Sequence, residues 1–272
     1  MCAILFVVSW STFARQTDGM AVDVLDVGQG DGIVIRTPGQ QTIVIDGGPS
    51  DDFSAEVSRK VPFYDRNIAL LILTHPHEDH VHGLVNLLSD YHVERVALTG
   101  VVAQSETYSE FLRLIEQQHI PIDYVHRGKV YDFGERVSMH ILAPIEDLHG
   151  KKVDDLNDSS IVATLQFDTI DFMFTGDAGE NIEKEMLADG DPLDVEVLKA
   201  GHHGSRYSSS DAFLDAMTPD VALISDGKNN RYGHPHKELL DRLTQHHIPI
   251  YRTDLLGDIE VKTDGKTFTV SP

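Results

Sequence analysis

The chain has 272 residues, enough for one large domain or two small ones, and its 41% hydrophobic and 24% charged residues exclude bulk disorder. The net charge of −22 argues against a histone-like nucleic-acid binder, although bound divalent cations could reverse the sign inside a cleft. The single cysteine, Cys2, excludes an intrachain disulfide framework and a cysteine-rich metal site.

Residues 2–14 carry no charge, and Arg15 follows them. The stretch is shorter than the roughly 20 apolar residues of a spanning helix, and no basic residues precede it as they would in a signal peptide. It could be a truncated membrane anchor, the end of a longer membrane segment, or a core strand. We therefore set residues 1–16 apart as a short apolar leader or membrane anchor and expect residues 20–272 to form one folded domain.

From Met20 onward, short apolar runs alternate with turn signals, and no Pro-, Gly- or Ser-rich linker divides them. The first half is expected to contain strands at 22–27, 32–37, 41–45, 68–74 and 93–98 and helices at 54–60, 81–89 and 106–119. The second half is expected to contain strands at 137–142, 161–168, 170–175, 194–199 and 221–225, with further strands near 250, 258–262 and 268. Its helices are expected at 180–187, 209–217 and 237–247. This order indicates a layered α/β domain with helices outside the sheets.

Candidate ligands follow the ends of four predicted strands. They are Asp46, the run His75–His80, Asp177, and the pair formed by His202 and His203. Loops at strand ends converge on one edge of a layered α/β fold, and binding sites are built there. The sequence therefore predicts one composite site.

Imidazole and carboxylate ligands suit zinc, iron or manganese. We expect His75 and His77 to hold one ion and Asp79 and His80 to hold a second, with Asp177 bridging the two. Two such ions would hold a hydroxide whose parent water titrates near pH ~7. The sequence therefore indicates a hydrolytic site.

Other interpretations exist for several of these residues. Asp177 could instead be a turn residue that caps the next helix, and the loop at 201–205 could be a glycine-rich helix entry. Asp46 is interpreted as a buried acceptor that orients a ligand histidine. His234 could face the same edge, as a proton donor or a phosphate contact, or it could lie on the surface.

The pattern His75-x-His77-x-Asp79-His80 resembles the signature of the metallo-β-lactamase superfamily. Further phrases resemble the hydrolase domain of ComEC-type competence proteins, and the resemblance covers about residues 20–272. These phrases are Leu25–Asp31, Ile45–Gly48, Asn157–Val162, Thr175–Asp177, Lys199–Ser205, Tyr232–Pro235 and Tyr251–Asp254.

The resemblance implies a four-layer αββα sandwich with two divalent ions, Zn or Mn, at its edge. It implies the ligands His75, His77, Asp79, His80, Asp177 and one histidine of the 202–203 pair. We prefer His202, which comes first after the strand and leaves His203 to orient a ligand or face the substrate. Asn157 and Asp158 stand where the wider superfamily has another histidine, so Asp158 is a candidate replacement ligand.

The leading hypothesis is a phosphodiesterase or nuclease that acts on DNA in ComEC-like uptake, with Asp79, Asp177, His203 and His234 as catalytic residues. The resemblance adds a membrane channel protein as a candidate partner and suggests a stand-alone form, tethered through residues 2–14 with the hydrolase domain outside the cytoplasm. One alternative is a hydrolase of a small ester, a phosphocholine ester, a lactone or a nucleotide. Another is a non-catalytic partner of a separate channel.

Overall fold

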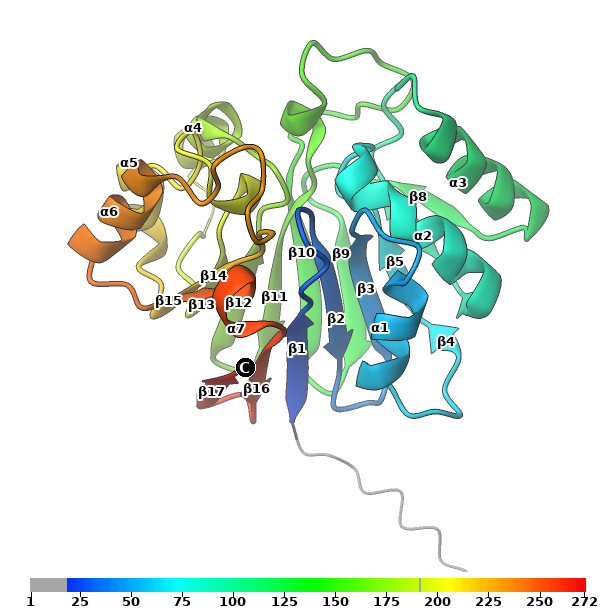
Figure 1. Cartoon of the computed structure of the whole chain (residues 1–272), viewed down its shortest axis with the longest axis horizontal. Coiled ribbons are helices and arrows are strands. Elements are labelled where there is room, and N and C mark those ends of the chain that lie inside the picture. Colours follow the sequence, from blue (N-terminus) through cyan, green and yellow to red (C-terminus); the bar gives the residue numbers. More distant parts are fainter. Residues whose placement is uncertain (1–18, 191) are drawn as a thin grey trace, which may run out of the picture.

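Two β-sheets lie face to face in the computed structural model, which describes residues 19–190 and 192–272, and helices cover both outer faces (Figure 1). This arrangement confirms the predicted αββα sandwich. The predicted leader at 1–16, with its candidate tether at 2–14, lies outside the described residues. In the described ranges, no helix combines the length and the apolar character that crossing a bilayer requires.

The first sheet has eight strands and combines residues from both ends of the described chain. In spatial order they are β17 (Phe268–Ser271), β16 (Ile259–Thr263), β1 (Met20–Val24), β2 (Gly32–Arg36), β3 (Thr42–Gly47), β5 (Leu70–Ile72), β7 (Val96–Leu98) and β8 (Ile122–Tyr124). The strands from β17 to β3 pair antiparallel, and those from β3 to β8 pair parallel.

The second sheet has seven strands. In spatial order they are β15 (Ile250–Arg252), β14 (Val221–Ile224), β13 (Val197–Lys199), β12 (Ile170–Phe174), β11 (Val162–Phe167), β10 (Val137–Ala143) and β9 (Val130–Gly134). The strands from β12 to β15 are parallel, so their carboxyl ends share one edge. A separate two-stranded pair consists of β4 (Asn67–Ile68) and β6 (His92–Val93).

The helices divide between the two outer faces. The first sheet is covered by α1 (Phe53–Lys60), α2 (Glu78–Asp90) and α3 (Glu106–Gln117). The second sheet is covered by α4 (Glu180–Asp189), α5 (Asp211–Met217) and α6 (Lys237–Gln245). The short α7 (Thr253–Leu256) links β15 to β16, and two single 3-10 turns, η1 (Leu156–Ser159) and η2 (His202–Gly204), lie in the loops.

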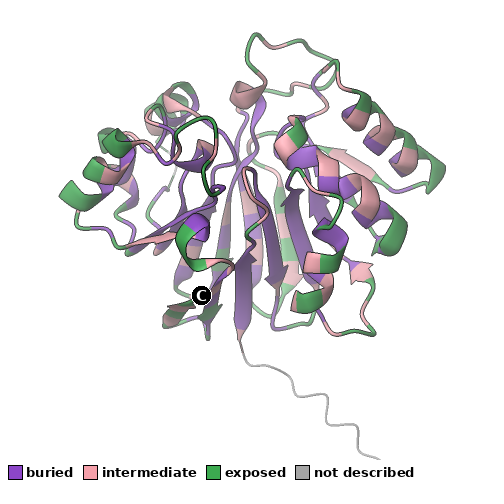
Figure 2. Ribbon diagram, in the orientation of Figure 1, coloured by how far each residue is buried: buried purple, intermediate pink, exposed green. Residues whose placement is uncertain are grey.

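Three buried apolar clusters hold these layers together, and the burial is clear in Figure 2. Side chains alternate between the two faces of a strand. In β3, Ile43 and Ile45 therefore join the cluster between the sheets, whereas Val44 joins the cluster under α1–α3. A strand that is buried on both faces reads as a continuous apolar run, which is why the sequence predicted this strand.

The difference from the predicted elements that bears on the site concerns the histidine run. Helix α2 begins at Glu78 and not at residue 81, with His77 as its N-cap. Two acidic side chains, Glu78 and Asp79, occupy the first turn, where the positive end of the helix dipole stabilises negative charge. Asp79 and His80 are therefore held by a helix, while His75 lies in the loop that precedes it.

Candidate metal centre

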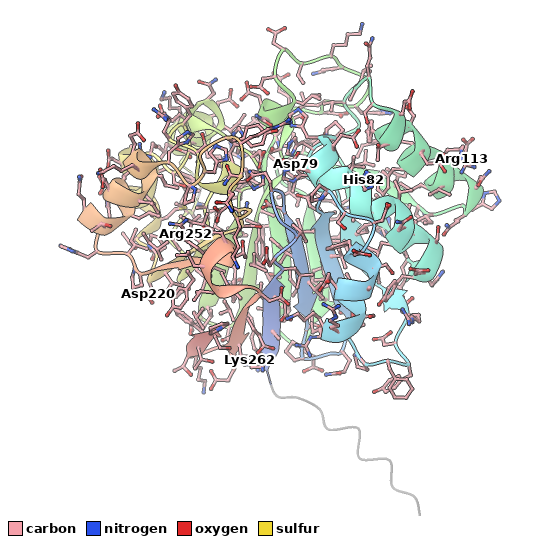
Figure 3. The ribbon with its side chains drawn as sticks, in the orientation of Figure 1. Asp79, His82, Arg113, Asp220, Arg252 and Lys262 are labelled. Carbon is pink, nitrogen blue, oxygen red and sulfur yellow. The ribbon has the colours of Figure 1, made fainter. Side chains whose placement is uncertain are left out.

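The candidate ligands meet at the edge where strands of both sheets end. Asp79 marks this edge in Figure 3, at the opposite end of the molecule from Lys262. Gly30 allows the loop after β1 to approach closely, because a Cβ at this position would lie 2.3 Å from the backbone oxygen of Asp79. The loop after β1 therefore lies directly against the first turn of α2.

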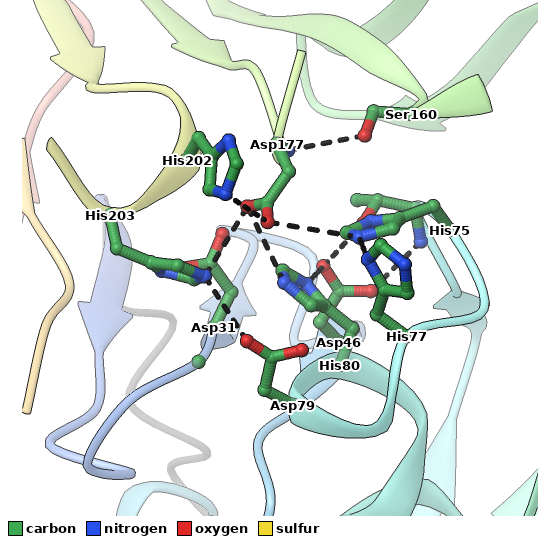
Figure 4. Close-up of polar contacts among 12 residues, drawn as sticks. Asp31, Asp46, His75, His77, Asp79, His80, Ser160, Asp177, His202 and His203 are labelled. Carbon is green, nitrogen blue, oxygen red and sulfur yellow. Dashed lines mark hydrogen bonds and ion pairs between the residues drawn. The ribbon is translucent and has the colours of Figure 1, made fainter. Parts of the chain in front are cut away.

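His75, His77 and Asp177 form the first cluster, in which one potential ligand atom from each lies within 4.8 Å of the others. His75 Nε2 lies 2.9 Å from His77 Nδ1 and 3.7 Å from Asp177 Oδ2 (Figure 4). The predicted partners of the first ion are thus brought together from the loop after β5 and the loop after β12.

Asp79, His80 and His203 form the second cluster, by the same 4.8 Å criterion. His203 Nε2 lies 3.6 Å from Asp79 Oδ2. Asp177 Oδ1 lies 3.4 Å from both His80 Nε2 and His203 Nε2. The two oxygens of Asp177 therefore point to different clusters, which is the placement that a bridging carboxylate requires.

Three atoms in this group are buried without any hydrogen-bond partner in the described part of the chain. They are His80 Nε2, Asp177 Oδ1 and His203 Nε2. A buried polar atom without a partner is costly, and native proteins rarely leave three of them in contact. Because all three are metal-ligand types that converge on one space, the residues fit divalent ions.

The carboxylate of Asp46 holds the imidazole of His80 in place. It accepts hydrogen bonds from Thr74 N at 2.8 Å and Thr74 Oγ1 at 2.7 Å, and its Oδ2 lies 2.8 Å from His80 Nδ1. Holding Nδ1 in this way leaves His80 Nε2 to face the cluster. The contact confirms the interpretation of Asp46 as an acceptor that orients a histidine.

Sequence reasoning missed a second supporting pair, Asp31 and Lys199. Asp31 Oδ1 lies 3.3 Å from His203 Nδ1, and Asp31 Oδ2 accepts from Lys199 Nζ. His203 Nδ1 also lies 3.1 Å from the carbonyl oxygen of Ser225. One signal for this pair was present in the sequence. Asp31 lies in the loop after β1 and Lys199 is the last residue of β13, and the other candidate site residues also lie at or beyond strand ends.

This geometry favours His203 as the ligand, whereas the sequence favoured His202. His202 Nε2 reaches only to 3.7 Å from Asp177 Oδ2, its side chain is 32% exposed, and it belongs to neither cluster. Both histidines adopt left-handed backbone angles, with φ values of 48° and 53°. This tight turn in η2 carries the second histidine inward, which spacing along the sequence cannot indicate.

Asp158, the candidate replacement ligand, lies outside both clusters. Asp158 lines a separate pocket beside Asn181, whereas its neighbour Asn157 lines the cleft with His77 and Asp177. Asp155 Oδ1 accepts from Asn157 N and fixes this orientation at the start of η1. Asn157 Oδ1 is buried without a partner in the described residues, so the asparagine occupies the place expected for Asp158.

The electrostatics of the cluster centre on Asp177. Burial alone would raise its pKa, but His203 and His80 hold it well below the usual range. For His80 the directions are reversed: burial alone would lower its pKa, but Asp177 and Asp46 raise it well above the usual value. Burial, followed by the charge of His80, lowers the pKa of His75. The centre therefore contains a buried, ionised carboxylate, which is stabilised by positive charge around it.

His234 lies at the mouth of a cleft of about 380 Å³ and not on a remote surface. The cleft is lined by Gln29, His77, Glu78, Asp79, Asn157, Asp177, His202, His203, Tyr232 and His234. Burial, then His203 and His202, lower the pKa of His234 to about 4. Its Nδ1 lies 3.3 Å from Gln29 Nε2. His234 is therefore neutral at neutral pH and placed to contact a bound group.

Comparison with known proteins agrees with this geometry. The family model described as the metallo-beta-lactamase superfamily matches residues 25–226. ComE operon protein 3 of Bacillus subtilis (strain 168) is 31% identical over 270 residues, covering 92% of this chain and 34% of that protein. Competence protein ComA of Neisseria gonorrhoeae is 30% identical over 254 residues, covering 93% of this chain and 34% of that protein.

The chain thus spans about a third of the length of the curated relatives it matches. Among solved structures, Igni18, described as a novel metallo hydrolase from the hyperthermophilic archaeon Ignicoccus hospitalis, superposes with a TM-score of 0.57. The match covers 88% of this chain and 98% of that one at 13% identity, which shows a shared fold.

Proposed function

Because the chain belongs to the metallo-beta-lactamase superfamily, we propose that it hydrolyses phosphodiesters, with DNA as the substrate, using two divalent ions, Zn or Mn. The observation that carries the proposal is the pair of ligand clusters with Asp177 between them. A carboxylate whose two oxygens point to two different ligand clusters is typical of a two-metal hydrolytic site.

One ion would be held by His75, His77 and Asp177, and the other by Asp79, His80 and His203 with Asp177 shared. Bound there, divalent ions would lower the pKa of a water and neutralise the charge that develops on a phosphodiester.

The chain's own residues supply positioning. Asp46 holds His80, while Asp31 and the Ser225 carbonyl hold the imidazole of His203. Asp79 and Asp177 remain ionised because their histidine neighbours keep both pKa values low, despite burial.

The role of His234 follows from its tautomer. The Gln29 amide nitrogen can only donate, so His234 Nδ1 accepts and the ring proton sits on Nε2. With a pKa of about 4, the ring is neutral at neutral pH, and Nε2–H is left to donate a hydrogen bond to a bound group. Of the two roles considered for His234, a contact to a phosphate oxygen therefore fits better than a proton donor.

The DNA substrate draws support from the relatives, which are named as competence and ComE operon proteins. We extend the proposal to a role in DNA uptake beside a membrane channel protein. In this proposal, residues 2–14 tether the hydrolase domain to the membrane, and the domain lies outside the cytoplasm.

A hydrolase of small esters, phosphocholine esters, lactones or nucleotides is the second candidate. The net charge of −22 favours it, because a small substrate needs no basic groove. A non-catalytic partner of a channel is the third candidate, and its support is Asn157, which stands in the cleft in place of a histidine.

The test is to load purified protein with Zn or Mn, measure the metal content, and assay DNA, bis-p-nitrophenyl phosphate and a lactone side by side. We expect about two ions per chain and cleavage of both phosphodiesters, with Asp177→Asn losing both. Cleavage of the lactone alone would establish the second candidate. Fewer than one ion per chain, without activity, would establish the third.

A further inference from the structure

The loop that follows β14 forms one rim of the cleft and carries an aromatic side chain that the hydrolytic site does not use. Tyr232 lines the cleft and is 49% exposed, which is high for a large aromatic ring. Its ring stacks on that of His234, with centroids 5.8 Å apart and an angle of 22° between the planes. An accessible aromatic face therefore lies beside the proposed phosphate contact.

The loop is held in this shape by Asn230. Its Oδ1 accepts from Tyr232 N at 3.1 Å and His234 N at 3.0 Å, and its Nδ2 donates to Gly227 O at 2.9 Å and His234 O at 2.7 Å. Gly227 lies against the loop after β1, since a Cβ there would be 2.6 Å from Gln29 N. A ligand that binds here does not have to order the loop, so the position of Tyr232 is preorganised.

The same rim is cationic. Residues 227–236 include Lys228 and Arg231 and no acidic residue, in a chain with a net charge of −22. The Tyr232 hydroxyl, and more weakly Asp79, raise the pKa of Arg231, so this guanidinium lies within electrostatic range of the second cluster. The cleft lining also includes the carboxylates of Glu78 and Asp79. The positive charge of this loop therefore stands close to acidic side chains.

Arg231 shows what the aromatic face accepts. Its guanidinium carbon lies 4.9 Å from the centroid of the Tyr232 ring, and Nη2 donates to the Tyr232 hydroxyl at 2.7 Å. A planar group already contacts this ring, and a nucleobase is a planar group of similar thickness. A base that replaced Arg231 on the ring would release an exposed cation for the neighbouring phosphate.

We propose that residues 227–234 form a subsite for single-stranded DNA, in which Tyr232 stacks on the base next to the reacting phosphodiester and Arg231 and Lys228 contact backbone phosphates. The inference rests on the proposed function and adds the form of its substrate. Aromatic stacking combined with a cationic strip is the usual means of binding single strands. In a duplex each base is already stacked on both faces, so the subsite selects unpaired DNA.

The test measures binding to the metal-loaded protein by fluorescence anisotropy, with phosphorothioate-linked probes that resist hydrolysis. The probes are a labelled oligothymidylate, an abasic oligonucleotide with the same backbone, and a duplex. Wild type should bind the oligothymidylate most tightly. Tyr232→Ala should reduce the ratio of the oligothymidylate and abasic affinities by about tenfold, whereas Tyr232→Phe should preserve it. Tyr64→Ala is the matched control, since Tyr64 is 76% exposed in the loop between α1 and β4, at the other end of the molecule (Figure 1).

Arg231→Gln and Lys228→Gln test the phosphate contacts. Each should weaken binding to both single strands alike and reduce the slope of log affinity against log salt by about 0.7. An unchanged base dependence in Tyr232→Ala, or equal affinity for duplex and single strand in wild type, would overturn the subsite. Because these are binding measurements, a protein that cleaves no phosphodiester could still show the subsite, and an active nuclease could still lack it.

Discussion

Lys199 forms a buried ion pair with Asp31 that joins the two sheets directly behind the metal centre. The side chains are 1% and 2% exposed, so neither charge is solvated by water. Burial alone would raise the pKa of Asp31, but Lys199 and then His203 lower it to about 2. The other oxygen of Asp31 faces His203, so the pair links the core of the sandwich to a candidate ligand.

Removing one partner should therefore be costly. Lys199→Met leaves the carboxylate of Asp31 buried without its counterion, and we expect a loss of about 3–5 kcal/mol in the free energy of unfolding, measured by urea denaturation. The matched control is Lys237→Met, because Lys237 is 81% exposed and pairs with Asp241 on the surface of α6. Its loss should stay below about 1 kcal/mol. Similar losses in the two variants would show that the buried pair is unimportant.

The two adjacent histidines should differ in metal retention. His203→Ala removes an atom that faces both Asp79 and Asp177, whereas His202→Ala removes one that is partly exposed at the edge. Metal content after dialysis, measured by mass spectrometry, should fall by about one ion per chain in the first variant and stay near the wild-type value in the second. The reverse result would restore the preference that the sequence alone suggested.

Substitution of Asp46 should act on the metal through His80. Asn at this position has one oxygen to replace two, so it cannot serve Thr74 N, Thr74 Oγ1 and His80 Nδ1 together. Asp46→Asn should weaken metal affinity about 10–100-fold, measured by competition with a chelating dye. The control is Asp51→Asn, whose side chain is 80% exposed. Equal affinities in both variants would contradict the orienting role.

The protein should lose stability through Asp226 as the pH rises from acid to neutral. This side chain is fully buried, and burial, then the charge of Asp254, raise its pKa to about 7. A carboxyl group whose pKa is raised on folding stabilises the protein while it is protonated, and this stabilisation is lost as the pH rises through the folded value.

The melting temperature of wild type should therefore fall between about pH 4 and about pH 8, and Asp226→Asn should reduce the fall. The buried histidines titrate in both proteins, so the difference between the two curves isolates Asp226. Asp52→Asn, an exposed position without a side-chain cap bond, is the control and should follow wild type. Parallel curves for wild type and Asp226→Asn would refute the assignment.

Much of the centre could be predicted because its chemistry is local in sequence. The run His75–His80 contains four candidate ligands within six residues, and Asp177 could be recognised because it follows a buried strand. The fold followed from the same apolar runs, since strands such as β3 are buried on both faces. The strands that escaped prediction, β8 and β9, are edge strands whose residues are largely exposed or half-buried, so they lack a continuous apolar signal.

The remaining features depend on three-dimensional placement. Asp31 and Lys199 are 168 residues apart, and no sequence pattern pairs them. The choice between His202 and His203 depends on two left-handed backbone conformations, and the choice between Asn157 and Asp158 on a single 3-10 turn. In each pair the two candidates are adjacent in the sequence, and the conformation of the folded backbone determines which side chain faces the cleft.

The pairing of β1 with β16 has a consequence for how the protein is made. β1 lies between β2 and β16, with Met20 opposite Thr263, so β1 is synthesised long before the strand that completes its pairing. Until residues 259–263 have left the ribosome, the outer edge of β1 exposes unpaired backbone groups, a template for pairing with another chain. Completion of the first sheet therefore waits for the synthesis of β16, and a nascent chain stalled before β16 would be vulnerable to aggregation.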